Sequence, residues 1–248
     1  LAWVEECGGD DGDSSAEIEA ASDGSAMLTG SFYGHAVFGE GDPNETVLDS
    51  DGTSMFLAKY NDDGSLEWAR QAIGQRSNGT GVSSLPDGST VVAGTFCGSM
   101  LLGEGETNET TLESHGDDED CFIAMYDSEG SLVWATRAGG DNLERASRIE
   151  ALPGGDSVVT GVYWGNSSVF GEGESNETVL TAQDIYDVSV FVAKYDACGS
   201  LIWAKQVEDG LEGTSAAGID ALPDESAILN GNNCGWEVCN AFVAKYNP

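Results

Sequence analysis

Short apolar runs separated by glycine-rich and acidic turns dominate this chain, whereas stretches with the 3.6-residue period of an amphipathic helix are nearly absent. Two of the clearest runs are STVVAGTF, at residues 89–96, and SVFVAKY, at residues 189–195. Runs of this length, rich in valine and aromatic residues and bounded by turn residues, are typical of β-strands. Since the chain also has 34 glycines and only 5 prolines, the pattern predicts an all-β protein rich in turns.

The pattern repeats along the chain. A run of the form Phe-aliphatic-Ala-Lys/Met-Tyr occurs four times, ending at Tyr60, Tyr126, Tyr195 and Tyr246. The first three copies are preceded by an acidic phrase close to FGEGESNETVL and followed by a turn and the run GSLxWA. The fourth copy is shortened and carries GNNCGWEVCN in place of the acidic phrase. Such a period indicates a repeat architecture, in which each unit packs against its neighbours.

Each unit contains four strand signals in a fixed order. The first is short and ends in a turn, as in IEALPGG from Ile149, and the second is the valine-rich run. The third ends at the repeated tyrosine and the fourth contains tryptophan; turns such as DSEG, at residues 127–130, join them. Glycine in these turns can adopt the left-handed conformation that a tight hairpin needs. Four antiparallel strands per unit, repeated, predict the blades of a β-propeller.

The two ends of the sequence predict that the ring is closed. Leu1 to Val4 match the tryptophan strand, whereas the chain stops just after the tyrosine strand of the last unit. We therefore expect the strand of Trp3 to pair with that of Tyr246, completing a four-bladed propeller without free sheet edges. Part of a seven- or eight-bladed ring, or an open array, would show the same boundaries. The expected blades span residues 15–71, 80–137, 146–206 and 216–246, the last completed by residues 1–5.

The repeated aromatic residues are expected to fill the wedges between neighbouring blades. The tryptophans of the fourth strands are Trp3, Trp68, Trp134 and Trp203. Each tryptophan buries around 200 Å², which makes it well suited to such a core. An aromatic box for a ligand is the alternative role.

The phrases F(V/I/L)AKYDxxGSLxWA, LPDGSxVVxG and FGEGExNETxL resemble the SBBP repeats of bacterial secreted propeller proteins. The resemblance covers almost the whole chain. It implies the propeller fold and an exported or surface protein, and it implies no particular reaction. The chain departs from that family in its acidity, its cysteines and its shortened fourth unit.

The charge of the chain restricts its partners. With 44 acidic and 9 basic residues, the formal net charge is -35, which repels nucleic acid and anionic membrane surfaces. The sequence contains no run of eighteen apolar residues, so we do not expect it to insert into a membrane. The charge is consistent with a solvated surface adapted to salt or to an extracellular milieu, and with capture of divalent cations by clustered carboxylates.

Cysteine usage favours an oxidising compartment. None of the six cysteines forms a CxxC pair, so disulfides are more plausible than metal ligation. Cys97 and Cys121 are expected on adjacent strands of one blade, and Cys234 and Cys239 flank the short hairpin of the fourth unit, so both pairs are predicted disulfides. The remaining cysteines, which we expect to pair between molecules, are Cys7 and Cys198.

The first residue is not methionine and no signal peptide precedes it, so we expect a processed mature chain or a fragment, secreted or at the cell surface. The acidic phrase is expected to form a hairpin that three blades project from one face, as a structural element or as a contact surface. Five asparagines fit the N-x-S/T acceptor pattern for glycosylation, which turn chemistry alone would also explain. They are Asn44, Asn78, Asn108, Asn166 and Asn176.

Acidic residues on the first strands suggest a cation site. Glu19, Glu150 and Asp220 occupy equivalent positions of three units, where strands crowd around the axis of a propeller. If they turn toward that axis, three carboxylates converge and can bind Ca²⁺, which prefers oxygen ligands. Separate solvated carboxylates are the alternative.

No catalytic motif accompanies the two histidines, His35 and His115, which are expected in surface loops. We therefore expect a non-catalytic structural or interaction propeller that assembles with itself or with cell-envelope components. A carbohydrate- or protein-recognition module is the first alternative. A quinoprotein-like dehydrogenase is the second, because those propellers also repeat a Gly-x-x-x-Trp outer strand.

Overall fold

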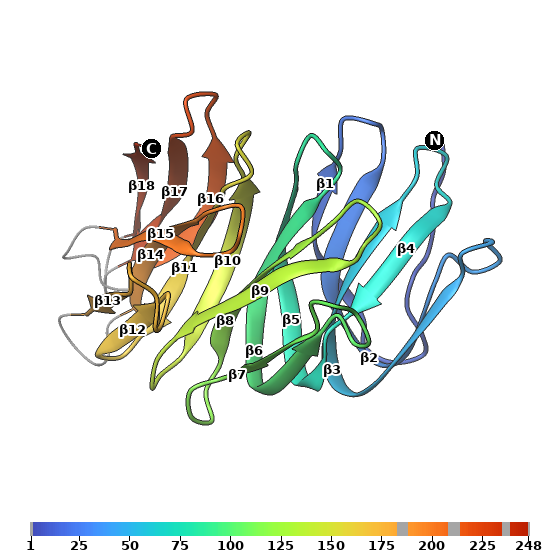
Figure 1. Ribbon diagram of the computed structural model, residues 1–248, viewed down its shortest axis with the longest axis horizontal. Coiled ribbons are helices and arrows are strands. Elements are labelled where there is room, and N and C mark those ends of the chain that lie inside the picture. The colour runs from blue at the N-terminus through green and yellow to red at the C-terminus, as the bar shows by residue number, and fades with distance from the viewer. Residues whose placement is uncertain (1, 183–187, 208–213, 235–238, 248) are drawn as a thin grey trace.

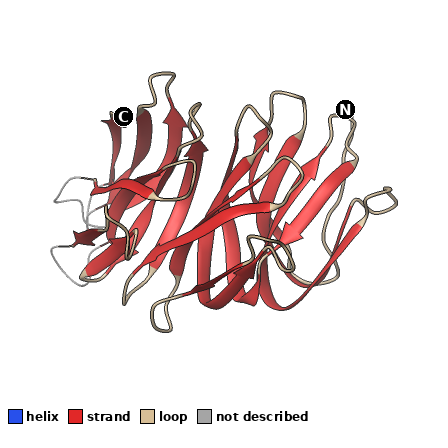
Figure 2. Cartoon of the chain, in the orientation of Figure 1, coloured by secondary structure: helices blue, strands red, loops and turns tan. Residues whose placement is uncertain are grey.

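The computed structural model describes residues 2–182, 188–207, 214–234 and 239–247. Within these ranges the chain is all-β and contains no helix (Figure 2). The described residues therefore contain no helix that is long and apolar enough to span a membrane.

The strands form four successive units along the molecule (Figure 1). Unit I consists of β1 (Ser14–Ala20), β2 (Ala26–Phe38), β3 (Thr46–Tyr60) and β4 (Leu66–Gln71). Unit II consists of β5 (Ile73–Ser84), β6 (Thr90–Leu102), β7 (Thr110–Glu113), β8 (Asp120–Tyr126) and β9 (Leu132–Gly139). Unit III consists of β10 (Glu144–Ala151), β11 (Ser157–Trp164), β12 (Ser167–Phe170), β13 (Thr178–Thr181), β14 (Val188–Tyr195) and β15 (Leu201–Gln206). Unit IV consists of β16 (Thr214–Ala221), β17 (Ala227–Cys234) and β18 (Cys239–Tyr246).

Each of the first three units is an antiparallel meander whose four main strands follow chain order, as the repeated pattern predicts. The acidic phrase forms the hairpin between the second and third main strands. We call β4, β9 and β15, the last strand of each unit, the tryptophan strands. Unit IV has no such strand among the described residues.

The hydrophobic core lies between successive units. One buried cluster joins Met27 and Leu57 of unit I to Val92 and Phe122 of unit II. Others join unit II to unit III and unit III to unit IV. Phe122 and Phe191 pack in these layers and are both 0% exposed, which confirms the predicted wedge-filling role at these two positions, whereas Phe56 and Tyr60 pack in a cluster of unit I residues.

A tryptophan contact is repeated between the units. The indole of Trp68, on β4, donates a hydrogen bond to the backbone oxygen of Ser128 in the β8–β9 turn of unit II (3.1 Å). The ring also covers Gly130 of this turn, where a Cβ atom would lie 2.6 Å from the indole Cδ2. Because Gly130 has a φ of +77°, the turn needs glycine for both its conformation and its space. Trp134 makes the same hydrogen bond to Ala197 of unit III (3.1 Å).

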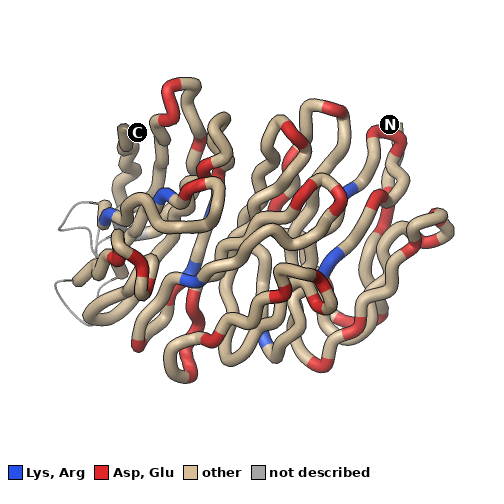
Figure 3. Tube along the Cα trace, viewed as in Figure 1, with Lys and Arg blue, Asp and Glu red and all other residues tan. Residues whose placement is uncertain are grey.

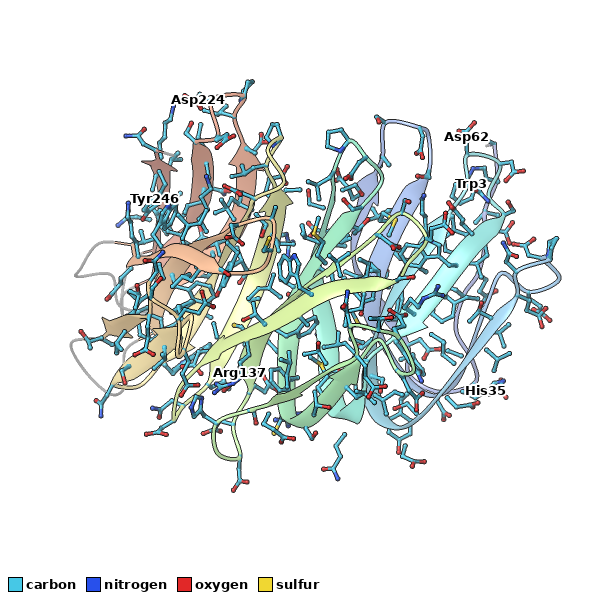
Figure 4. The ribbon with its side chains drawn as sticks, viewed as in Figure 1. Trp3, His35, Asp62, Arg137, Asp224 and Tyr246 are labelled. Atoms are coloured by element: carbon cyan, nitrogen blue, oxygen red, sulfur yellow. The ribbon has the colours of Figure 1, made fainter. Side chains whose placement is uncertain are left out.

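The N-terminal segment lies on unit I as a tryptophan strand lies on the next unit. Trp3 donates to the backbone oxygen of Asp62 in the β3–β4 turn (3.0 Å), as Figure 4 allows one to follow. Gly8 pairs with Val37 of the unit I hairpin, just as Gly139 of β9 pairs with Val169 of the unit III hairpin.

The predicted closure of the ring is not shown. Residues 2–7 belong to no strand, and the sheet pairs of β18 involve β17 alone among the described residues. Trp3 and Tyr246 lie toward opposite ends of the molecule (Figure 4). The expected pairing of these residues with the strand of Tyr246 is thus not shown, and their contacts with unit I were not predicted.

Candidate functional site

The first strands of the units lie side by side and bring charged residues of different units together. β1 contacts β5, β5 contacts β10, and β10 contacts β16. Polar side chains bridge them: Glu17 Oε2 accepts from the backbone N–H of Val82 (3.1 Å), and Ser83 Oγ accepts from that of Ala151 (3.1 Å). We call this row of strands the first-strand face. It is the place where side chains from separate repeats can act on one ligand.

The three predicted calcium ligands interact at this face without forming a metal site. Burial, together with the nearby carboxylates of Glu19 and Asp220, raises the pKa of Glu150 to about 7. Glu19 and Asp220 therefore lie near Glu150. However, no three His, Cys, Asp or Glu side chains among the described residues are arranged to hold a metal ion. The calcium site therefore stays without structural support, and the alternative of separate carboxylates accounts for the arrangement.

A polar pocket of about 330 Å³ lies where units I, II and III meet. It contains two arginines that share one acidic partner. The Nη2 of Arg76, on β5, lies 3.4 Å from Oε1 of Glu119. The Nε of Arg145, on β10, donates a hydrogen bond to Oε2 of Glu119 (2.8 Å). Sequence analysis missed this site because Arg76 and Glu119 lie outside the repeated motifs.

The acidic hairpins are structural elements that attach to the tryptophan strands. In unit II, Glu106 accepts a hydrogen bond from the backbone N–H of Leu132 at the start of β9, and Glu109 accepts from that of Gly105 (2.7 Å). Gly103 has a φ of +64° and leaves no room for a side chain, since a Cβ would lie 2.9 Å from Cβ of Leu132. The equivalent carboxylates of the other hairpins are Asp42, Glu45, Glu174 and Glu177. The repeated phrase is thus explained by its own fold.

The asparagines of the hairpins are also occupied. The Nδ2 of Asn108 donates to the backbone oxygens of Leu132 (3.1 Å) and Val133 (3.0 Å). Asn44 and Asn176 donate in the same way to the tryptophan strands of their own units. Because a glycan replaces one of the two Nδ2 hydrogens, modification of Asn44 or Asn108 would remove at least one of these bonds. The structure favours the alternative interpretation, turn chemistry, for these three sites.

The other two acceptor asparagines differ from each other. Asn78 lies within β5, at the polar pocket, and the hydroxyl of Thr80 two residues later donates to the backbone oxygens of Ala93 (3.2 Å) and Ala146 (2.9 Å). This engaged strand position is unsuited to glycosylation. Asn166 is exposed in the turn between β11 and β12, and its side chain makes no hydrogen bond to another described residue.

The predicted Cys97–Cys121 disulfide is not formed, since both thiols are free. The register places Thr95 opposite Cys121, which leaves Cys97 two residues further along β6. The thiol of Cys121 is buried, and burial raises its pKa well above the usual value. Cysteine spacing alone could not provide this register.

The predicted pairings of the remaining four cysteines stay predictions. Cys234 and Cys239 form the final register pair of β17 and β18, but the side chain of Cys234 is outside the described residues, and their bridge stays a prediction. Cys7 and Cys198 are free within the chain. Cys198 is exposed in the β14–β15 turn, whereas Cys7 is partly buried against unit I. Their pairing between molecules is untested.

A network of charged residues around His115 was not expected from the sequence. Asp120, which is 0% exposed, accepts from the backbone N–H of His115 (3.0 Å) and from Arg137 of β9 (3.2 Å). Arg137 also pairs with Glu172 in the hairpin of unit III, so the network links two units (Figure 4 labels Arg137). His115 lies in a loop, as expected, but is partly buried, whereas His35 is exposed beside Asp49 (2.8 Å) but lies on strand β2 rather than in the expected loop.

Comparison with known proteins shows a partial similarity to one repeat protein. No family model matches the chain. The uncharacterized WD repeat-containing protein L264 of Acanthamoeba polyphaga mimivirus is 28% identical over 111 residues, which cover 44% of this chain and 8% of that protein. The chain thus corresponds to a small part of the relative's length. This similarity and the repeated antiparallel units together support a propeller-like repeat protein, and the bacterial SBBP type stays a prediction.

Proposed function

We propose that this chain is a non-catalytic, propeller-type interaction module of the extracellular space or cell surface that assembles with copies of itself. The observation that carries this proposal is the position of residues 3–8 on unit I. Trp3 and Gly8 make there the two contacts that a tryptophan strand makes on the following unit. Unit I therefore presents a surface that fits the outer strand of a preceding unit.

The partner for such a strand is the open edge of β18. Val243 of this strand is 75% exposed, and an exposed strand edge is a template for adding a further strand. In unit II, Trp134 of β9 pairs with Met125 of β8. By the same register, Trp3 would face Lys245 and Glu5 would face Val243. Residues 3–8 would then connect two units as β4 and β9 do.

We propose that residues 3–8 of one chain pair with β18 of another copy of the chain. In the structure, residues 3–8 are held at unit I, at the opposite end of the molecule from β18 (Figures 1 and 4). Joining β18 of one copy to residues 3–8 of the next lets the units continue without a break. Pairing within one chain, which closes the four-bladed ring, is the competing outcome.

Engineered cross-linking distinguishes the two. Glu5→Cys with Val243→Cys, in a chain with Cys7→Ser and Cys198→Ser, should give a ladder of covalent multimers on non-reducing electrophoresis. Glu5→Cys with Val179→Cys is the control, because Val179 is 52% exposed on β13 of unit III, away from β18. A cross-linked single chain would demonstrate the closed ring and refute assembly through this edge.

Light scattering of the unmodified sequence tests self-assembly itself. The mass of the particles should rise with concentration, and Trp3→Ala should shift this rise to a higher concentration. Tyr33→Ala is the control, because it removes a half-exposed aromatic side chain of unit I outside the contact. A mass equal to one chain at every concentration, unchanged by Trp3→Ala, would contradict the proposal.

The charge of -35 adds a requirement for counter-ions, since like-charged copies repel one another. We propose that divalent cations assist the assembly. A chelator at low salt should then reduce the particle mass, and an unchanged mass would exclude cation dependence. The polar pocket on the first-strand face favours a second candidate function, recognition of a small ligand.

A further inference from the structure

The pocket between units I, II and III offers polar groups that the fold does not use. Its volume of about 330 Å³ is at the lower end of the range for small-molecule sites, roughly 300–1,000 Å³. Strands β5 and β10 of the first-strand face and their neighbours β2, β3 and β6 contribute, so the pocket exists only where units meet. The side chains used below are Thr53, Arg76, Asn78, Glu119 and Arg145.

The pocket is a local positive site in an acidic protein. Arg76 and Arg145 share the single carboxylate of Glu119, which leaves one positive charge uncompensated within the group. Both guanidinium side chains are about half exposed, at 54% and 51%. Lys and Arg are sparse elsewhere along the chain, where Asp and Glu predominate (Figure 3). A ligand with one negative charge is therefore better matched to this site than to its surroundings.

The donors of the pocket are available. Arg76 and Arg145 contact Glu119 through one nitrogen each, while a guanidinium carries five N–H donors. The side chains of Thr53 and Asn78 form no hydrogen bond to other described residues. A bound molecule can therefore receive guanidinium hydrogen bonds at one end and hydroxyl or amide hydrogen bonds at the other.

We propose that this pocket binds a monomeric sugar acid, with its carboxylate on Arg76 and Arg145 and its hydroxyl groups on Thr53 and Asn78. Arginine matches a carboxylate with two parallel hydrogen bonds. A polyanion is disfavoured by the charge of -35. A neutral sugar is disfavoured because it does not use the positive charge of the two arginines.

Calorimetric titration with glucuronate tests the proposal, with glucose as the matched ligand that lacks the carboxylate. Glucuronate should bind at millimolar or lower concentration and glucose at least about tenfold more weakly. Trp164 provides a second signal, because Arg145 lies 6.0 Å from its ring and a ligand on Arg145 should change its fluorescence. Equal binding of glucose, or no binding of glucuronate, would overturn the proposal.

Variants locate the site. Arg145→Gln and Arg76→Gln should each weaken glucuronate binding about tenfold or more, because charge-assisted hydrogen bonds are lost. Lys205→Gln removes the same charge from an exposed position on β15 and should leave the affinity within about twofold. Thr53→Val tests the hydroxyl end and should weaken glucuronate while leaving the response to salt unchanged. An affinity insensitive to Arg145→Gln, or equally sensitive to Lys205→Gln, would refute the site.

Titration with trigalacturonate tests whether the ligand is a free monomer or part of an acidic polysaccharide. We expect trigalacturonate to bind more weakly than glucuronate, since three carboxylates meet the negative field of the protein. Tighter binding of the trimer would overturn the assignment of a monomeric ligand. None of these measurements depends on self-assembly, so the two proposals succeed or fail separately.

Discussion

Replacing Asn108 by aspartate isolates the contact that attaches the acidic hairpin of unit II to its tryptophan strand. The two side chains have nearly the same shape, but aspartate lacks the N–H groups that Asn108 donates to the backbone oxygens of Leu132 (3.1 Å) and Val133 (3.0 Å). A carboxylate in this position also directs a negative charge at two carbonyl oxygens. The substitution therefore removes two bonds and adds repulsion without creating a cavity.

The expected loss follows from these contacts. Two hydrogen bonds at a net contribution of about 1 kcal/mol each give about 2 kcal/mol, and unpaired carbonyl groups with repulsion raise this to about 2–4 kcal/mol. The matched control is Asn166→Asp, at an exposed asparagine whose side chain has no hydrogen-bond partner among the described residues. Its free energy of unfolding should change by less than about 0.5 kcal/mol.

Urea unfolding followed by tryptophan fluorescence measures both variants, with the midpoints compared at equal slope. Asn108→Asp should lower the midpoint well below that of Asn166→Asp. Equal midpoints for the two variants would refute the assignment of Asn108 as a structural residue. Intact mass after expression in a secretory eukaryotic cell gives an independent check, because Asn108 should remain unmodified.

Three further predictions concern titration, packing and thiols. Burial raises the pKa of Glu144 from 4.5 to about 8 in the folded protein. The contribution of this group to stability is therefore fully present below pH 4.5 and is lost as the pH rises through 8. The free energy of unfolding should fall by about 1.4 kcal/mol per pH unit from this group across that window, and Glu144→Gln should remove this slope in urea titrations. Gly130→Ala should lower the free energy of unfolding by about 2–4 kcal/mol, because it combines a left-handed backbone with a clash against Trp68. The control is Gly105→Ala, which also has a left-handed backbone (φ +76°) but open space around it and should cost about 1–2 kcal/mol. Thermal unfolding compares the two variants. Cys121 should react with a thiol reagent only after denaturation, and rapid labelling of the folded protein would contradict its burial.

Local sequence patterns were sufficient for the strands and the turns. The runs ending at Tyr60, Tyr126 and Tyr195 form the third main strand of their units, and the turn at Gly130 has the left-handed backbone that its glycine indicated. These features depend on alternation, on β-branched and aromatic residues, and on the conformational freedom of glycine, all of which are readable over a few residues. The match of LAWV to the tryptophan strand indicated the type of segment, and the contact of Trp3 with unit I is of the same kind as that of Trp134 with unit III.

Distances across strands and between units could not be obtained in this way. The Cys97–Cys121 prediction was wrong because a shift of two positions in register separates residues that the motif order places together. The carboxylates of Glu19 and Asp220 raise the pKa of Glu150, yet no three such groups among the described residues are arranged to hold a metal ion, which equivalent positions in the repeat could not reveal.

The sequence by itself determined a repeated all-β chain, its strand order and its turn chemistry, because each depends on neighbours within one unit. Only the tertiary structure decided that the acidic phrase attaches to the tryptophan strand, that Arg76 and Arg145 share Glu119, and that residues 3–8 lie on unit I apart from β18. These outcomes depend on register and on packing between units, where residues far apart in the chain meet and no local pattern records the pairing.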